Sequence, residues 1–105
     1  MPYDDTLVVR YLRQAHDTSL LTAREKHLVG LAVTLTRGCQ VCTRNRIEKA
    51  QSAGLGDDVL NALVDIVSAV NAGVAAATAR EGYRMADAAA EPPCDDICSG
   101  DAGRS

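Results

Sequence analysis

The segment at residues 59–70 constrains the fold of this chain more than any other feature. Nine of its twelve residues are apolar, and only Asn61, Asp65 and Ser68 interrupt them. In a helix such a segment is apolar on almost every side, and a chain of 105 residues has few places to bury it. We therefore expect a helix that lies either at the centre of a helical bundle or at an interface between subunits.

The composition limits how much apolar surface one chain can bury. Its 105 residues suffice for one domain but not for two independent cores. Hydrophobic residues make up 47% and charged residues 24%, which is typical of a globular protein, yet Trp and Phe are absent. The core must therefore consist of Leu, Val, Ile and Ala, and we expect copies of the chain to assemble into an oligomer.

The net charge and the distribution of apolar residues limit the classes of partner that this protein can bind. The chain has eleven Lys and Arg residues and fourteen Asp and Glu residues. The resulting net charge of −3 argues against nucleic acid as a binding partner. No apolar run reaches the roughly 18 residues of a membrane-spanning helix, so we expect no membrane partner. Residues 1–5 lack the basic and then apolar pattern of a secretory signal, which predicts a cytoplasmic protein.

Helical periodicity covers the first part of the chain. Apolar residues repeat along one face of residues 4–16, which predicts a first helix. A second helix opens at Thr22, because Glu25 stands three residues later and completes a capping box. Gly38 is typical of the left-handed residue that ends such a helix.

The same signals continue to about residue 90. A third helix begins near Cys39 and closes at Gly54, and Asp57 is the expected N-cap of the next helix. Residues 71–73 predict a break or kink, after which an Ala-rich helix continues over 74–90. The expected fold is therefore all-α, with about five helices.

Residues 92 and 93 are both proline and stop the last helix. The sequence thus predicts a single helical domain over residues 1–90. The segment 91–105 is short, polar and rich in Gly and Asp, so we expect it to be a flexible acidic tail.

Four cysteines fall as two close pairs, Cys39/Cys42 and Cys94/Cys98. In a reducing compartment such pairs are typical of catalytic or metal-binding sites rather than of a disulfide framework. A C-x-x-C motif near a helix start places both sulfurs on one face, where they can form a bond or bind one metal. The free N–H groups of the helix start favour the thiolate, as do the nearby cations Arg37, Arg44, Arg46 and Lys49.

Three interpretations of Cys39 and Cys42 remain open from the residues alone. They could be small buried hydrophobes. All four cysteines could bind zinc, with Asp95 and Asp96 as further ligands, although the spacing of the second pair is looser than that of a typical zinc knuckle. Redox chemistry is the interpretation that we favour.

Residues 21–33 (LTAREKHLVGLAV), 38–42 (GCQVC) and 50–59 (AQSAGLGDDV) together resemble the carboxymuconolactone decarboxylase and alkylhydroperoxidase D-like family. The resemblance covers roughly residues 20–85. It implies an all-helical fold assembled as a homotrimer or homohexamer. In the peroxidase branch of the family, the second cysteine attacks a hydroperoxide and the first then forms a disulfide with it, which implies that Cys42 attacks and Cys39 resolves. The residues alone suit Cys39 equally well as the nucleophile, because it lies nearer the helix end.

The sequence departs from that branch at two positions. The branch has a glutamate twelve residues before the first cysteine and a histidine four residues after the second, where this chain has His27 and Arg46. His27 can accept a thiol proton near neutral pH. Arg46 lies one helical turn from Cys42 and can hold a thiolate by charge, but it cannot act as a base. His27 and Arg46 therefore join the two cysteines as candidate catalytic residues.

The acidic tail provides a secondary redox pair in Cys94 and Cys98. Its charge is opposite to that of the basic residues around Cys39, and a flexible tether raises the effective concentration of the tail. We hypothesise that the tail docks there and exchanges electrons with the first pair through a mixed disulfide.

The sequence thus predicts a thiol-dependent oxidoreductase that needs no cofactor. Its substrate would be a small hydroperoxide, or a protein or small-molecule disulfide, and a thiol reductant would complete the cycle. Two alternatives remain: a zinc- or thiol-binding regulatory module, and a lactone decarboxylase-like enzyme that does not use the cysteines.

Overall fold

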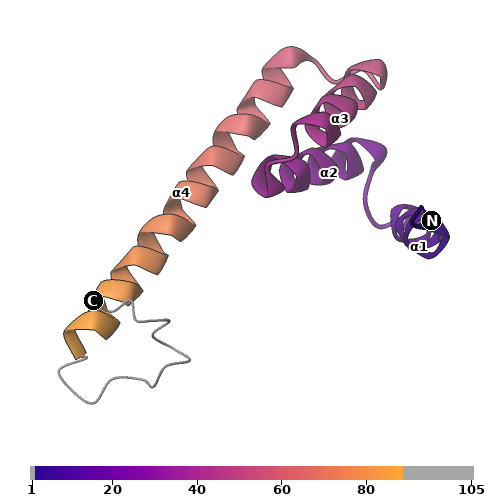
Figure 1. The fold of residues 1–105 in the computed structure, drawn as a ribbon. Helices are drawn as coiled ribbons and strands as arrows, with labels where there is room; N and C mark the ends of the chain where they lie inside the picture. The colour runs from indigo at the N-terminus through magenta and orange to yellow at the C-terminus, as the bar shows by residue number, and fades with distance from the viewer. Residues whose placement is uncertain (1, 89–105) are drawn as a thin grey trace. The chain divides into compact units, whose positions relative to one another are not determined.

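The computed structural model describes residues 2–88 and is all-helical over that range (Figure 1). This confirms the predicted fold class. Four helices follow in chain order within the described residues: α1 (Thr6–His16), α2 (Ala23–Arg37), α3 (Gln40–Ser52) and α4 (Asp57–Ala88).

The chain divides into two compact units, residues 1–68 and 69–105. The first unit contains α1, α2, α3 and the start of α4. The described part of the second unit, residues 69–88, is the remainder of α4. Near its end, Arg84 Nη2 lies 2.6 Å from Glu81 Oε2, and this hydrogen bond lowers the pKa of the exposed Glu81.

Both ends of α2 form as the sequence predicts. Thr22 Oγ1 accepts a hydrogen bond from Glu25 N at 3.1 Å, and Glu25 Oε1 accepts one from Thr22 N at 2.8 Å, which confirms the capping box. At the other end Gly38 has a φ of 81°, the left-handed conformation that only glycine adopts without strain. These two caps fix the length of α2.

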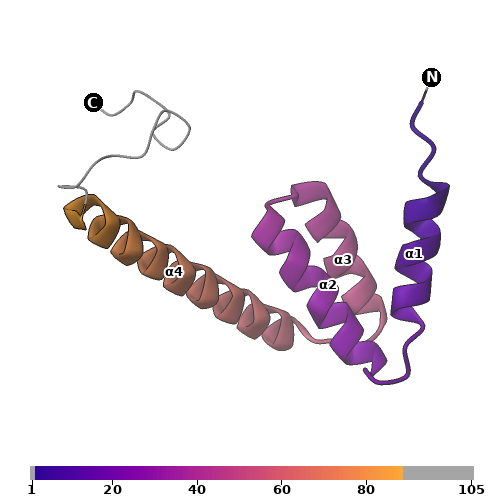
Figure 2. The ribbon, with the colours of Figure 1, turned by 90° about the horizontal axis from the view of Figure 1, so that it is seen from below.

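Helices α2 and α3 pack side by side and form the centre of the first unit (Figure 2). Leu31 of α2 and Ala50 of α3 are fully buried against each other's helix. Leu55, in the turn after α3, and Leu60, in the first turns of α4, complete the buried cluster. The core is small and aliphatic, as the lack of Trp and Phe requires.

The predicted break at residues 71–73 is wrong, because α4 is one continuous helix through that segment. This is why the described chain has four helices where the sequence predicted about five. A single Gly73 costs about 1 kcal/mol in a helix, and the alanines around it have the highest helix propensity. Without a proline, the sequence there lacks a residue that would end the helix.

Many apolar side chains in the described residues stay exposed. On α1, Leu7 and Tyr11 are 74% and 73% exposed, and on α4 Ile66, Val70 and Val74 are exposed as well. The apolar stripe predicted for the first helix thus forms but has little covering it among residues 2–88.

By length and composition alone, α4 also qualifies as a helix that can cross a membrane. The sequence expectation considered only uninterrupted apolar runs and missed this. The helix reaches the required hydropathy despite Asn61, Asp65 and Asn71. Its polar residues Asn61, Asp65 and Ser68 lie three or four positions apart, so they form one stripe along the helix.

Two glycine-to-alanine substitutions should change stability in opposite directions. Gly38→Ala places a Cβ on a left-handed residue and should lower the free energy of unfolding by about 1 kcal/mol. Gly73→Ala lies inside α4, where the new Cβ would meet no described atom within 4 Å apart from its chain neighbours and the backbone of its own helix, and should raise it by about 0.5–1 kcal/mol. Urea unfolding at one fixed protein concentration measures both. A loss of stability in Gly73→Ala would contradict an open, regular helix at this position.

Candidate redox site

The turn between α2 and α3 determines where the two cysteines lie. Cys39 N donates a hydrogen bond to Thr34 O at 3.2 Å, and Gly38 N donates one to Leu35 O at 3.2 Å. This pair of bonds is the Schellman pattern, which closes a helix through a left-handed glycine. Cys39 is therefore the residue at which α2 is already closed and α3 can start.

Cys39 is also the N-cap of α3. Its φ and ψ of −89° and 108° are extended, and its Sγ accepts a hydrogen bond from Cys42 N at 3.1 Å. This sulfur occupies the position where a Ser or Asp oxygen usually caps a helix. The free N–H group at the helix start thus points at sulfur, and this arrangement stabilises negative charge on Cys39 Sγ when the bond is reduced.

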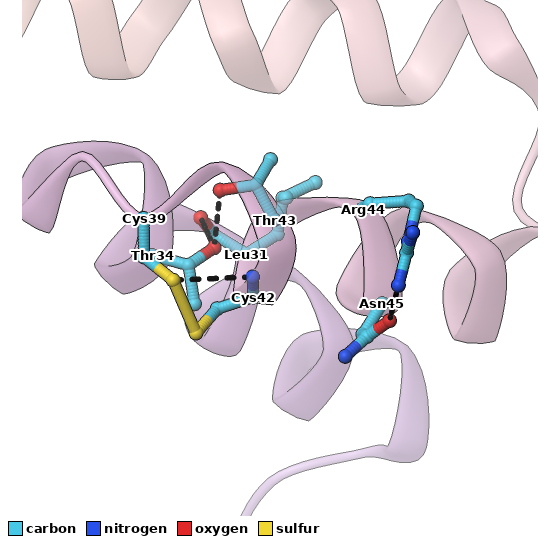
Figure 3. The surroundings of a disulfide bond; sticks show 7 residues. All are labelled: Leu31, Thr34, Cys39, Cys42, Thr43, Arg44 and Asn45. Atoms are coloured by element: carbon cyan, nitrogen blue, oxygen red, sulfur yellow. Dashed lines mark hydrogen bonds between the residues drawn. A yellow bond between two sulfur atoms is a disulfide. The ribbon is translucent and has the colours of Figure 1, made fainter.

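Cys39 and Cys42 form a disulfide, with 5.3 Å between their Cα atoms (Figure 3). Their positions as N-cap and third residue of α3 bring the two sulfurs together on one face. Cys42 is exposed and Cys39 is half-buried. The pair is therefore reachable from solvent, chiefly through Cys42, and is not part of the buried core.

A hydroxyl chain links the two helices beside the disulfide. Thr43 Oγ1 donates to Thr34 Oγ1 at 3.0 Å, and Thr34 Oγ1 donates to Leu31 O at 3.1 Å (Figure 3). Sequence analysis did not single out these threonines, since nothing in a lone Thr indicates a partner nine residues away. These two hydrogen bonds join the first turn of α3 to α2 and so hold the turn that contains the cysteines against the core.

A groove of about 660 Å³ lies beside Cys39. Its lining includes the half-buried Cys39 but not Cys42, so the groove lies on the Cys39 side of the disulfide. Its walls come from the end of α2 and one face of α3: Thr34, Leu35, Gly38, Cys39, Gln40, Thr43, Arg44, Ile47, Glu48 and Gln51.

The comparisons with known proteins identify the family. The model of the carboxymuconolactone decarboxylase family matches residues 6–84, which is most of the chain. The chain belongs to the carboxymuconolactone decarboxylase family. It is also similar to a crystal structure of a protein from Methanobacterium thermoautotrophicum, a structural genomics target. The two share 26% identity with a TM-score of 0.71, over 79% of this chain and 95% of that one. No curated protein matches the chain significantly.

In this family member, His27 and Arg46 both line one pocket between the helices of the first unit. Both side chains are half-buried. Within residues 2–88, neither one hydrogen-bonds to Cys39 or Cys42. The structure thus brings His27 and Arg46 together in one pocket, whereas Cys39 lines a different groove.

Metal binding is not apparent in the part of the chain that the structure describes. Residues 2–88 contain no group of three His, Cys, Asp or Glu side chains that could hold an ion. Cys94 and Cys98 lie outside the described residues. A zinc site built from all four cysteines would therefore depend on residues beyond Ala88.

The disulfide predicts a specific peptide mass. Trypsin cleaves after Arg37 and Arg44, so both cysteines fall in one peptide of residues 38–44. Without reduction, this peptide should be lighter by two hydrogen atoms than after reduction, because the bond joins Cys39 to Cys42. Mass spectrometry of a digest of thiol-blocked native protein measures this. A peptide 38–44 joined to the one that contains Cys94 and Cys98 would contradict the pairing.

Proposed function

We propose that this protein is a thiol-dependent oxidoreductase in which Cys39 and Cys42 alternate between a dithiol and a disulfide. The observation that carries the proposal is the disulfide at the exposed N-terminus of α3, with a backbone N–H directed at Cys39 Sγ. A disulfide that served only stability would have little need of an exposed Cys42. Membership of the carboxymuconolactone decarboxylase family, which contains decarboxylases and peroxidase-like enzymes, is compatible with this activity.

Disulfide exchange requires only these two residues and a substrate disulfide. The thiolate of Cys42 attacks one substrate sulfur, a mixed disulfide forms, and one substrate thiolate leaves. Cys39 then attacks the sulfur of Cys42, the Cys39–Cys42 bond forms, and the second substrate thiolate leaves. The substrate gains two electrons and two protons, and a thiol reductant returns both cysteines to the reduced form.

Hydroperoxide reduction would use the same pair. The Cys42 thiolate attacks the terminal peroxide oxygen, which yields a sulfenic acid and releases an alcohol after protonation. Cys39 then attacks the sulfenic sulfur, water leaves and the same disulfide forms. This route benefits from a proton donor for the leaving alkoxide. Arg46 cannot readily supply that proton, and His27 has no hydrogen bond to the pair within the described residues, so we favour disulfide exchange.

The surroundings of the two sulfurs support different roles for them. Cys42 is exposed, so it meets the substrate first. Cys39 is half-buried and receives the N–H of Cys42, which makes its sulfur the better leaving group when the disulfide is reduced again. Cys42 is therefore the proposed attacking residue and Cys39 the proposed resolving residue, with His27 and Arg46 as neighbouring candidates.

Single cysteine variants test these roles. With a small aromatic disulfide as substrate and dithiothreitol as reductant, Cys42→Ser and Cys39→Ser should each lose turnover by at least about 100-fold. Mixed with the substrate disulfide alone, without dithiothreitol, reduced Cys39→Ser should hold a mixed disulfide at Cys42, because Cys39 is no longer there to resolve it, and Cys42→Ser should not. Turnover and intact mass measure both effects, and the same assay with an alkyl hydroperoxide separates the two substrates. Wild-type turnover in Cys42→Ser would contradict the proposal.

The tail cysteines have a proposed role of their own. We place Cys94 and Cys98 as the secondary pair that passes electrons to the disulfide at Cys39 and Cys42. The variant Cys94→Ser/Cys98→Ser should then keep the single-turnover oxidation of the reduced enzyme, whereas re-reduction of its disulfide should slow several-fold. Stopped-flow assays measure the two half-reactions separately. Unchanged re-reduction by a protein thiol reductant would remove this role.

We also propose a cytoplasmic homo-oligomer, a trimer or a hexamer, with α4 covered by copies of the chain rather than by lipid. Exposed apolar residues on α1 and α4 support this, as does the polar stripe of α4. Within that stripe, Asp65 would cost about 3 kcal/mol at the centre of a bilayer. A stripe of this kind suits a helix with one side in water.

A charge on the apolar side of α4 should separate the copies. Val70 is 60% exposed in the single chain, so Val70→Glu costs little there and much in an interface. Ser68→Glu lies on the polar stripe and is the matched control. Light scattering after gel filtration without detergent should give three or six chains for the wild type and the control, and a smaller mass for Val70→Glu. A monomeric wild type, or one found only in the membrane fraction, would contradict the assembly.

A further inference from the structure

A pocket of about 480 Å³ in the first unit has a lining that includes neither Cys39 nor Cys42. It shares no lining residue with the groove beside Cys39. Three helices contribute to it, in chain order α1, α2 and α3: Val9, Leu12, Arg13, His16, Ala23, Lys26, His27, Arg46 and Lys49.

The charge of this pocket is one-sided. Four side chains in its lining carry a fixed positive charge, two are histidines, and no carboxylate belongs to it. This contrasts with a chain that has fourteen acidic residues and a net charge of −3. Within residues 2–88, none of these six side chains forms an ion pair with a carboxylate. The acidic side chains nearby, Asp5, Asp17 and Glu48, line adjoining hollows instead.

One of the cations lies close against the backbone of α2. Gly30 is buried, and a Cβ built there would collide with Nη1 and Cζ of the Arg46 guanidinium. The guanidinium thus lies flat on α2 at a position that only a glycine leaves free. Sequence analysis missed this role, because a lone glycine in a helix does not reveal which side chain passes over it. A half-buried guanidinium is well suited to bind an oxyanion through two parallel N–H groups.

The rest of the lining is apolar. Val9, Leu12 and Ala23 contribute hydrocarbon surface beside the cations. His16 Nδ1 lies 2.9 Å from Leu12 O, so this nitrogen donates its proton to a carbonyl of its own helix. Crowded cations without counter-charges beside hydrocarbon are complementary to a molecule that carries a negative head and a short apolar body.

We propose that this pocket binds a small amphipathic organic anion, with a carboxylate or phosphate head against Arg46 and Lys49 and an aliphatic body against Val9 and Leu12. The site does not rest on the oxidoreductase activity, because the two cavities have separate linings. The variant Cys39→Ser/Cys42→Ser should therefore keep the binding, so that failure of one proposal leaves the other testable.

Calorimetric titration of the full chain with sodium octanoate tests the site. Octanoate should bind with one site per chain, and Arg46→Gln should weaken it about tenfold, the loss expected for one charge-assisted hydrogen bond. Arg24→Gln is the matched control, since Arg24 is an exposed cation of α2 that lines none of the pockets described here, and it should bind within about twofold of the wild type. Gly30→Ala should weaken binding as Arg46→Gln does, because the new Cβ displaces the guanidinium.

Four further probes separate the contribution of the charged head from that of the aliphatic body. Octyl phosphate should bind comparably to octanoate, whereas acetate and inorganic phosphate, which lack the body, should bind at least about tenfold more weakly. Octanol, which lacks the charge, should lose affinity as well. Equal weakening in Arg24→Gln, octanol as tight as octanoate, inorganic phosphate as tight as octyl phosphate, or no octanoate binding at millimolar concentration would each overturn the proposal.

Discussion

The hydrogen bond from Cys42 N to Cys39 Sγ is the interaction on which the candidate redox site depends. It exists because Gly38 adopts a left-handed conformation, closes α2 and leaves Cys39 extended at the start of α3. Cys39 thereby donates a hydrogen bond that closes α2 and also caps α3. The same local geometry sets the spacing of the sulfurs and their exposure, and it supplies the backbone dipole that favours a thiolate. The Thr34–Thr43 contact then holds this turn against the core.

The small core explains why so much of the chemistry lies near the surface. Leu31 and Ala50 join α2 to α3, while many apolar side chains of α1 and α4 stay exposed among the described residues. A side chain on the α2–α3 pair can therefore lie close against the backbone of the other helix without being buried deeply. Arg46 over Gly30 is the clearest case, since the missing Cβ gives the guanidinium its place.

Local signals made much of the fold predictable from sequence. The capping box at Thr22, the left-handed Gly38 and the C-x-x-C at a helix start each depend on residues within four positions of one another, and all three form as expected. The continuity of α4 was missed because Asn71 and Gly73 were weighed as breakers against an alanine-rich helix. The pocket around Arg46 and the threonine pair join residues of different helices. No local pattern in one sequence encodes such contacts, so only the structure brings them to light.

The most direct test of the central claim is a redox titration of the native protein in dithiothreitol and glutathione buffers. Thiol labelling and mass spectrometry of residues 38–44 would follow the state of Cys39 and Cys42. An accessible, chemically active couple predicts one reversible two-electron transition within the range of these buffers, with both thiols labelled after reduction under native conditions. If the two sulfurs stay unlabelled and unchanged until the protein unfolds, the pair is structural and the proposed oxidoreductase activity is contradicted.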